Sequence, residues 1–254
     1  DTFMFYALVH SKLVCDFEFE PVLADVEELN QRSLLNELDV SKVSFQTAGK
    51  ILNHYAIFNS GAALGKGVGP LLVGKNVFQI DDLKNCSVAI PGYNTTAFSL
   101  LQRFFPQIKN IKPVIFSQVE NEVLNGNVDL GLIIHENRFT YQKRGLKKQA
   151  DLGELWEQST GLPIPLGGIA GKRQLGFEAL KEIDAAIKSS VEFAFSNTDE
   201  VMSYVRIHAQ EMNDDVMLQH IQLYVNQFSI ELGQDGRNAV EQFLQKKASE
   251  IFID

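Results

Sequence analysis

One arrangement of residues occurs twice in this chain, and it constrains the fold more than any other feature. Residues 27–36 have the spacing of a helix, and the apolar run that follows them, residues 38–45, is typical of a strand. Residues 120–125 repeat the helical pattern, end at Gly126 and precede a second strand-like run, residues 128–135. A helix, a turn and a buried strand used twice predict an α/β protein.

The repeat also indicates two lobes. When Asp39 is aligned with Asp129, the two helix–strand segments match, although such segments are common in any α/β protein. We expect a βαβ-like layout in each lobe, with both strand ends directed toward one cleft. Lobe 1 is then formed by residues 1–75 and 170–254, and lobe 2 by residues 76–169.

The remaining segments fit this plan. Strands are expected at residues 85–90 and 112–116, and the helix Ala97–Phe105 can be capped by Thr95 or Thr96. Outside the repeat, the prolines and glycines of residues 161–168 indicate a crossover between the lobes. Apolar residues at helical spacing predict helices at residues 177–195, 199–212 and 236–252. We expect the last third of the chain to be scaffold around lobe 1.

Charge and composition exclude several classes of partner. The chain has 23 basic and 32 acidic residues, so its net charge of −9 makes nucleic acid an unsuitable partner. No apolar run approaches the roughly 20 residues that span a bilayer, and no signal peptide is visible, so we expect no membrane association. Cys15 and Cys86 are far apart, and we expect reduced thiols in a cytoplasmic protein, although one disulfide between them stays open.

Two segments are similar to known phosphate-binding and zinc-binding motifs but lack residues that those motifs require. The glycine-rich segment 61–70 has three residues where a phosphate-binding Walker loop needs four, and Gly67 replaces the required hydroxyl residue. The segment that starts at His135 begins like a zinc-protease helix, but Phe139 occupies the position of the second histidine. We therefore expect no metal site.

His135 is the first candidate for catalysis. It follows the buried run Gly131–Ile134, and α/β folds place their ligands at strand ends. Imidazole is also the side chain whose ordinary pKa best suits proton transfer near neutral pH. The alternative is a histidine at a strand end that is hydrogen-bonded to a loop.

Other candidates lie at a helix start and at the matching strand end of lobe 1. The turn Thr95-Thr96-Ala97 either caps a helix or offers its free N–H groups to a carboxylate or phosphate. The run Lys42-Val43-Ser44 suits an anionic, oxygen-rich ligand, although Lys42 can also extend to solvent. Ser60 can contribute to the site, and Arg138 can pair with a substrate carboxylate, but a salt bridge to a nearby acidic residue is the stronger expectation.

Several of these segments together resemble the 1,4-dihydroxy-6-naphthoate synthase family, which belongs to the futalosine route to menaquinone. The resemblance covers essentially the whole chain, and the run Gly131–Tyr141 is its most specific part. The other matching segments are residues 1–10, 21–27, 60–70, 95–97 and 160–163. Family members carry a short strand and a Ser-Pro-Cys-Pro-Asn segment before the Asp-Thr-Phe sequence that is here residues 1–3. The resemblance implies that this preceding segment adds one wall of the site.

The resemblance implies a two-lobed fold like that of type II periplasmic binding proteins, used as a cytoplasmic enzyme. It implies that cyclic dehypoxanthine futalosine, a small molecule, is cleaved to 1,4-dihydroxy-6-naphthoate without a metal or an organic cofactor. The general base of the family falls on His135. The substrate-contact positions fall on Lys42, Val43 and Ser44 in one lobe and on Thr96 and Ala97 in the other.

Two other functions stay open. A non-catalytic solute-binding protein has the same fold, but such proteins are exported and need no proton-transfer residue. The chorismate dehydratase of the same pathway also shares the fold, but lacks the His-Glu-x-Arg-Phe-Thr-Tyr run that begins at His135.

Overall fold

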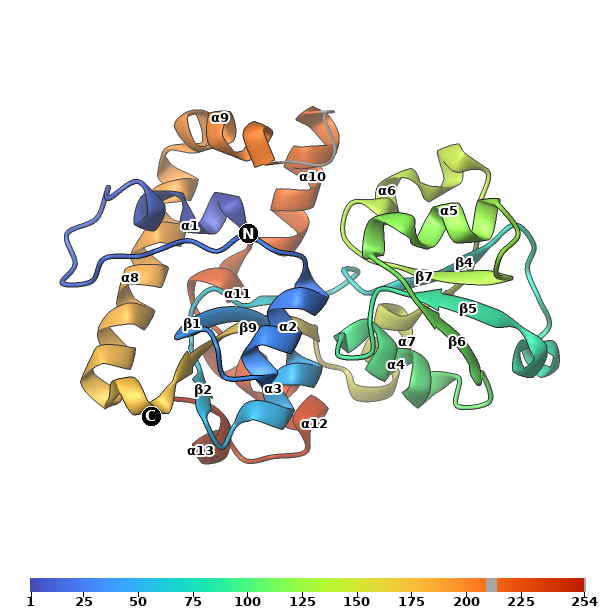
Figure 1. Cartoon of the computed structure of the whole chain (residues 1–254), viewed down its shortest axis with the longest axis horizontal. Coiled ribbons are helices and arrows are strands. Elements are labelled where there is room, and N and C mark those ends of the chain that lie inside the picture. The colour runs from blue at the N-terminus through green and yellow to red at the C-terminus, as the bar shows by residue number, and fades with distance from the viewer. Residues whose placement is uncertain (209–213, 254) are drawn as a thin grey trace.

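Two β-sheets, each covered by helices, form the two lobes of the molecule (Figure 1). The computed structural model describes residues 1–208 and 214–253. In lobe 1 the long strand β9 (Ile164–Lys172) pairs antiparallel with β1 (Val40–Ser44) on one side. On its other side it pairs antiparallel with β2 (Tyr55–Ile57) and β3 (Ala63–Gly65).

The sheet of lobe 2 has five strands in the order β6-β5-β7-β4-β8. Its strands are β4 (Leu71–Gly74), β5 (Ser87–Ile90), β6 (Asn110–Pro113), β7 (Leu130–Ile133) and β8 (Lys147–Asp151). The strand β5 runs parallel to β6 and β7, whereas β4 is antiparallel to β7 and β8. The end of β7 therefore lies on the same edge of the sheet as the end of β5, which leads into the helix α4.

Strand pairing corrects the expected lobe boundaries. Because β4 pairs with β7 and β8, the chain enters lobe 2 before residue 71 and not after residue 75. Because β9 pairs with β3 from Ile164 and with β1 from Gly167, it joins the sheet of lobe 1 before residue 169, although Ile164 still packs in the core of lobe 2. The prolines and glycines after position 163 therefore lie inside a strand and not in a crossover.

Helices cover both faces of the sheet in lobe 2, as the alternation of side chains along a strand requires. On one face, α4 (Thr96–Phe104) and α7 (Leu152–Thr160) pack on Leu72, Val88 and Leu132, with Trp156 fully buried. On the other face, α5 (Val119–Leu124) packs on Val73 and Ile133. The short helix α6 (Asn137–Thr140) follows His135.

Lobe 1 is covered by the remaining helices. One face of its sheet packs on α3 (Phe45–Ile51), α12 (Gly233–Leu244) and α13 (Ala248–Ile251), and the other on α8 (Phe177–Ser196). The helix α1 (Thr2–Val9) packs with α8, α9 (Thr198–His208) and α10 (Asp214–Tyr224) in a cluster of their own. The other helical segments are α2 (Val26–Leu34), α11 (Gln227–Ile230) and four 3-10 turns at Ile80–Asn85, Phe116–Gln118, Tyr141–Arg144 and Arg173–Leu175.

The repeated helix–strand segment is confirmed, as α2 with β1 and as α5 with β7. The strand expected at residues 112–116 is wrong in position, because β6 ends at Pro113. The helix expected at residues 236–252 is interrupted, since Gln245 adopts a left-handed conformation that ends α12. Of the helix expected at residues 199–212, positions 209–212 lie outside the described residues.

Two further observations concern the cysteines and the possibility of a membrane-spanning helix. Both Cys15 and Cys86 are free thiols. Within residues 1–208 and 214–253, no helix has the length and hydrophobicity that crossing a membrane requires.

Candidate active site

His135 lies at the turn between β7 and α6. Its backbone φ is 56°, in the left-handed region that residues other than glycine, asparagine and aspartate adopt only at a cost. This conformation ends the strand and places the ring against Phe116, edge to face, with centroids 5.1 Å apart. A backbone held in a strained conformation at a strand end is consistent with a functional residue.

The surroundings of His135 favour its neutral form. Withdrawal of the ring from water lowers the pKa of His135 below its ordinary value of 6.5, and the charge on Lys42 lowers it further. The carboxylate of Glu136 acts in the opposite direction and is outweighed. At pH 7 the imidazole therefore has a free lone pair, which a general base needs.

Lys42 brings a largely buried cation from β1 toward His135. Only 11% of its side chain is exposed, and its Nζ donates a hydrogen bond to the Gly61 carbonyl at 2.5 Å. The Asp1 carboxylate lies 3.5 Å from the same nitrogen. Burial lowers the pKa of Lys42 to about 7, so its charge is sensitive to any anion that binds beside it.

The two residues after Lys42 are buried in lobe 1. The side chain of Val43 belongs to the core of that lobe, so only its backbone is available to a ligand. The Oγ of Ser44 accepts a hydrogen bond from Nδ2 of Asn30 at 3.1 Å, and its N–H donates to Oδ1 of Asn30 at 2.9 Å. The Ser44 hydroxyl keeps its own proton for donation to a further acceptor.

The predicted contacts in lobe 2 lie at the start of α4. Thr95 is the N-cap, and its Oγ1 accepts a hydrogen bond from the N–H of Phe98 at 3.2 Å. The hydroxyl of Thr96 is used inside the protein, because it donates to the Leu166 carbonyl at 2.7 Å. The N–H groups of Thr96 and Ala97 belong to the first turn, which has no intrahelical acceptors, so the backbone is what these two residues can offer a ligand.

Asn94, two residues before α4, joins the lobes. Its side chain donates to Glu27 at 2.7 Å and accepts from Lys50 at 2.8 Å. Its carbonyl accepts from Thr47 at 2.9 Å and from Asn30 at 3.2 Å. Because Asn30 also holds Ser44, the strand end of lobe 1 and the helix start of lobe 2 are linked through one side chain.

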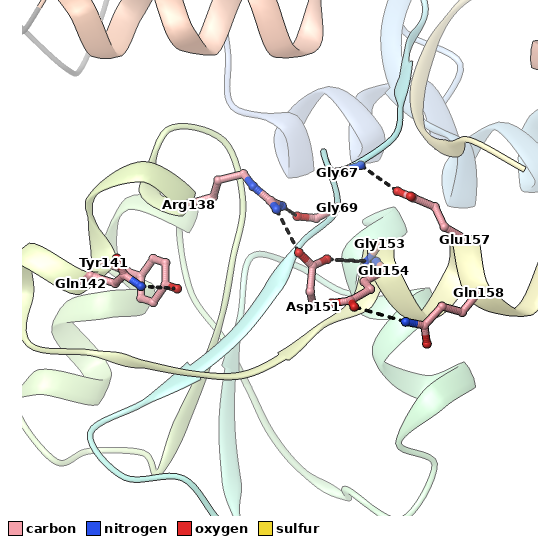
Figure 2. A network of polar contacts seen from close by, with 10 residues as sticks. All are labelled: Gly67, Gly69, Arg138, Tyr141, Gln142, Asp151, Gly153, Glu154, Glu157 and Gln158. Carbon is pink, nitrogen blue, oxygen red and sulfur yellow. Dashed lines mark hydrogen bonds and ion pairs between the residues drawn. The ribbon is translucent and has the colours of Figure 1, made fainter. Parts of the chain in front are cut away.

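Arg138 forms the expected salt bridge and is not free for a substrate carboxylate. Its guanidinium lies 2.9 Å from Asp151 and also donates to the Gly69 carbonyl (Figure 2). Asp151 in turn caps α7 through the N–H of Gly153 at 2.9 Å. A Cβ on Gly69 would lie 2.3 Å from Gly153, which explains a glycine in this segment. Arg138 thus fixes the segment after His135 to the crossing between the lobes.

Ser60 has a role within lobe 1. Its hydroxyl donates to the backbone carbonyl of Asp184 at 2.8 Å and contacts the Asp184 carboxylate, which also accepts from the Ser60 N–H at 2.9 Å. Ser60 is 2% exposed, and these bonds use both its hydroxyl and its N–H inside lobe 1.

Sequence reasoning missed one side of this site, the helix α10. The ring of His220 lies 5.9 Å from that of His135, and the ring of Tyr224 lies 4.7 Å from that of His220. From the sequence, the last third of the chain is expected to be scaffold, and none of its residues is a candidate for the site. The available signal was the spacing of four residues, which places His220 and Tyr224 on the same face of a helix.

Neither the hollows of the described structure nor its possible metal ligands indicate a second functional site. Two hollows, of about 370 and 820 Å³, are lined by none of the predicted site residues. In the described part of the chain, no three histidine, cysteine, aspartate or glutamate residues lie close enough to hold a metal ion.

Comparison with known proteins identifies the family of this chain. The model of a family described as menaquinone biosynthesis matches residues 1–249. A 1,4-dihydroxy-6-naphthoate synthase of Thermus thermophilus is 42% identical over 240 residues, which cover 94% of this chain and 87% of the relative. The Streptomyces coelicolor enzyme of the same name is 40% identical over 258 residues, or 100% of this chain and 91% of the relative.

Solved structures confirm the expected fold. A crystal structure of an Archaeoglobus fulgidus protein has a TM-score of 0.89 and 32% identity, over 96% of this chain and 91% of that one. A Candida albicans protein described as having the generic periplasmic binding protein fold has a TM-score of 0.61 and 13% identity, over 96% and 85% of the two chains. At that identity the likeness carries the fold alone, and the two-lobed fold is that of periplasmic binding proteins.

Proposed function

This chain belongs to the menaquinone biosynthesis family and is a lyase of the 1,4-dihydroxy-6-naphthoate synthase type, and we propose that it cleaves cyclic dehypoxanthine futalosine with His135 as general base. The observation that carries the assignment of the base is the position of His135. It lies in the turn after β7, in ring contact with His220 of a helix that packs on lobe 1, and burial lowers its pKa.

The proposed reaction begins with proton removal. The neutral imidazole of His135 takes a proton from a carbon next to a carbonyl of the substrate, and the electron pair moves toward the carbonyl oxygen. Fragmentation and aromatisation of the new ring follow, and aromatisation supplies the driving force. We expect this route to need no metal or organic cofactor, because its first step asks only for a base and for groups that stabilise charge on oxygen.

Groups from both lobes hold the substrate in this proposal. In lobe 2, the first N–H groups of α4, those of Thr96 and Ala97, bind the aromatic carboxylate at the positive end of the helix. In lobe 1, Lys42, the backbone of Val43 and the Ser44 hydroxyl bind the oxygen-rich remainder of the molecule. When the lobes are together, the site excludes water and the base is in place.

The cellular setting follows from the reaction. We infer a cytoplasmic enzyme that acts on one small molecule, with neither nucleic acid nor membrane as a partner. The support is the biosynthetic role of the family together with the net charge of −9.

One assay separates this function from its two rivals. The protein is incubated with cyclic dehypoxanthine futalosine or with chorismate, and the products are followed by absorbance and mass. We expect 1,4-dihydroxy-6-naphthoate from the first compound and no reaction of the second. Dehydration of chorismate would identify the sister enzyme, and binding without turnover would identify a solute-binding protein.

A further inference from the structure

The helix α10 brings a second histidine to the proposed base. It packs through Met217 and Ile221 on the helices of lobe 1, and it lies on the side of that lobe that faces lobe 2 (Figure 1). The rings of His220 and His135 meet edge to face at 71°, with centroids 5.9 Å apart. This contact therefore joins the two lobes at the site.

His220 has a polar atom without a partner. Its Nε2 is buried and makes no hydrogen bond. A buried polar atom without a hydrogen-bond partner is destabilising and rare in folded proteins, so such an atom calls for an explanation. Within the described residues the only comparable atom is Oε1 of Glu120, whose carboxylate is already ion-paired with Arg144. For His220, a ligand at the site is the natural partner.

The groups around His220 keep it neutral. Burial, with a smaller contribution from the neighbouring His135, lowers the pKa of His220 from 6.5 to about 3. Tyr224, whose ring lies 4.7 Å away, keeps its proton because burial raises the pKa of its phenol. The charged groups that act on Tyr224 are Arg138, Glu136 and Asp151. Nε2 of a neutral imidazole can carry the proton and serve as a hydrogen-bond donor.

We propose, on the basis of the proposed function, that His220 is a second catalytic residue whose Nε2–H donates a hydrogen bond to the carbonyl oxygen of the substrate. In the step it assists, the C–H bond next to the carbonyl breaks and an N–H bond forms on His135. The electron pair of that C–H bond forms a carbon–carbon double bond, and one carbonyl pair moves onto the oxygen. No atom leaves and no co-reactant is needed, and His220 stabilises the charge on the oxygen.

The contact between the rings allows His135 to remove the proton while His220 donates a hydrogen bond to the carbonyl oxygen. The carbonyl oxygen and the acidic carbon are two bonds apart, and two imidazoles in edge contact can reach neighbouring atoms of one molecule. A neutral donor also adds no second cation to the charge of Lys42, so His220 does not itself oppose the protonation of His135. Tyr224 packs against the His220 ring and acts as a positioning residue.

The test compares two substitutions at His220. His220→Phe keeps a planar ring without a donor, and we expect kcat to fall by about 10²- to 10³-fold, as when one donor to an oxyanion is removed, with little change in KM. His220→Gln supplies an amide donor, and we expect it to recover at least tenfold of that loss. His208→Phe, at an exposed position of α9, is the matched control and should keep the wild-type kcat.

The outcomes are distinct. The proposal is overturned if His220→Phe keeps kcat within threefold of wild type, or if the Phe and Gln variants lose activity equally. If His220→Phe does not fold, as judged by circular dichroism, His220→Leu replaces it in the same comparison. If the wild-type protein makes no naphthoate, the proposed function fails, and the role of His220 fails with it. A failure confined to the His220 variants leaves His135 and the reaction standing.

Discussion

His135 and His220 are in edge-to-face contact, with ring centroids 5.9 Å apart, although one lies in the turn after β7 in lobe 2 and the other on a helix that packs against lobe 1. Moving the lobes apart would separate the two rings. The proposed base and its neighbour therefore form one site only when the lobes are together, and we expect movement of the lobes to control the proposed reaction.

The first prediction concerns pH. Because burial lowers the pKa of His135 below 6.5, the base is neutral at pH 7 and becomes protonated only at lower pH. We expect kcat/KM, which reports on the free enzyme, to rise with pH on an acid limb below 6.5. Measurement of kcat/KM across pH checks this. An acid limb centred above pH 7 would contradict the neutral base.

The second prediction concerns Lys42. Its pKa of about 7 means that its charge is lost as pH rises through neutrality, so KM should increase above pH 7 in the wild-type protein. Lys42→Arg retains a cation at every accessible pH and should remove this dependence. Lys42→Met should raise KM by about 10- to 100-fold, the effect of losing a charge-assisted hydrogen bond. An unchanged KM in Lys42→Met would exclude the contact.

The third prediction concerns the junction of the lobes. Asn94→Ala removes the hydrogen bonds that the side chain makes with Glu27 and Lys50. We expect the free energy of unfolding to fall by about 1–3 kcal/mol in denaturant titrations, and KM to rise because the lobes close less readily. Asn53→Ala, at an exposed turn, is the control. Equal stability and equal KM in both variants would show that the junction at Asn94 is unimportant.

Local patterns in the sequence were sufficient to predict much of the fold. The segments that became α2 with β1 and α5 with β7 have clear periodicity and end at turn residues. The strand end at His135 was likewise visible, because an apolar run stops abruptly there. The salt bridge of Arg138 could be expected because acidic residues are common partners of arginine, although its identity as Asp151 required the structure.

Non-local pairing could not be predicted in the same way. The assignment of β4 to lobe 2 depends on its partners β7 and β8, which are distant in the sequence. The hydroxyl of Thr96 is used by Leu166, and no local pattern indicates that bond. The sequence pattern around His220 predicts a helix with a buried face, but it does not predict that the ring of His135 contacts that face.

His135→Asn tests the central claim most directly. Asparagine tolerates the left-handed conformation that His135 adopts, so the turn is kept while the base is removed. The measurement is turnover of cyclic dehypoxanthine futalosine to 1,4-dihydroxy-6-naphthoate, together with substrate binding by calorimetry. We predict a loss in kcat of about 10²- to 10⁴-fold, with a Kd close to that of wild type. Wild-type turnover in His135→Asn would contradict the assignment of the base.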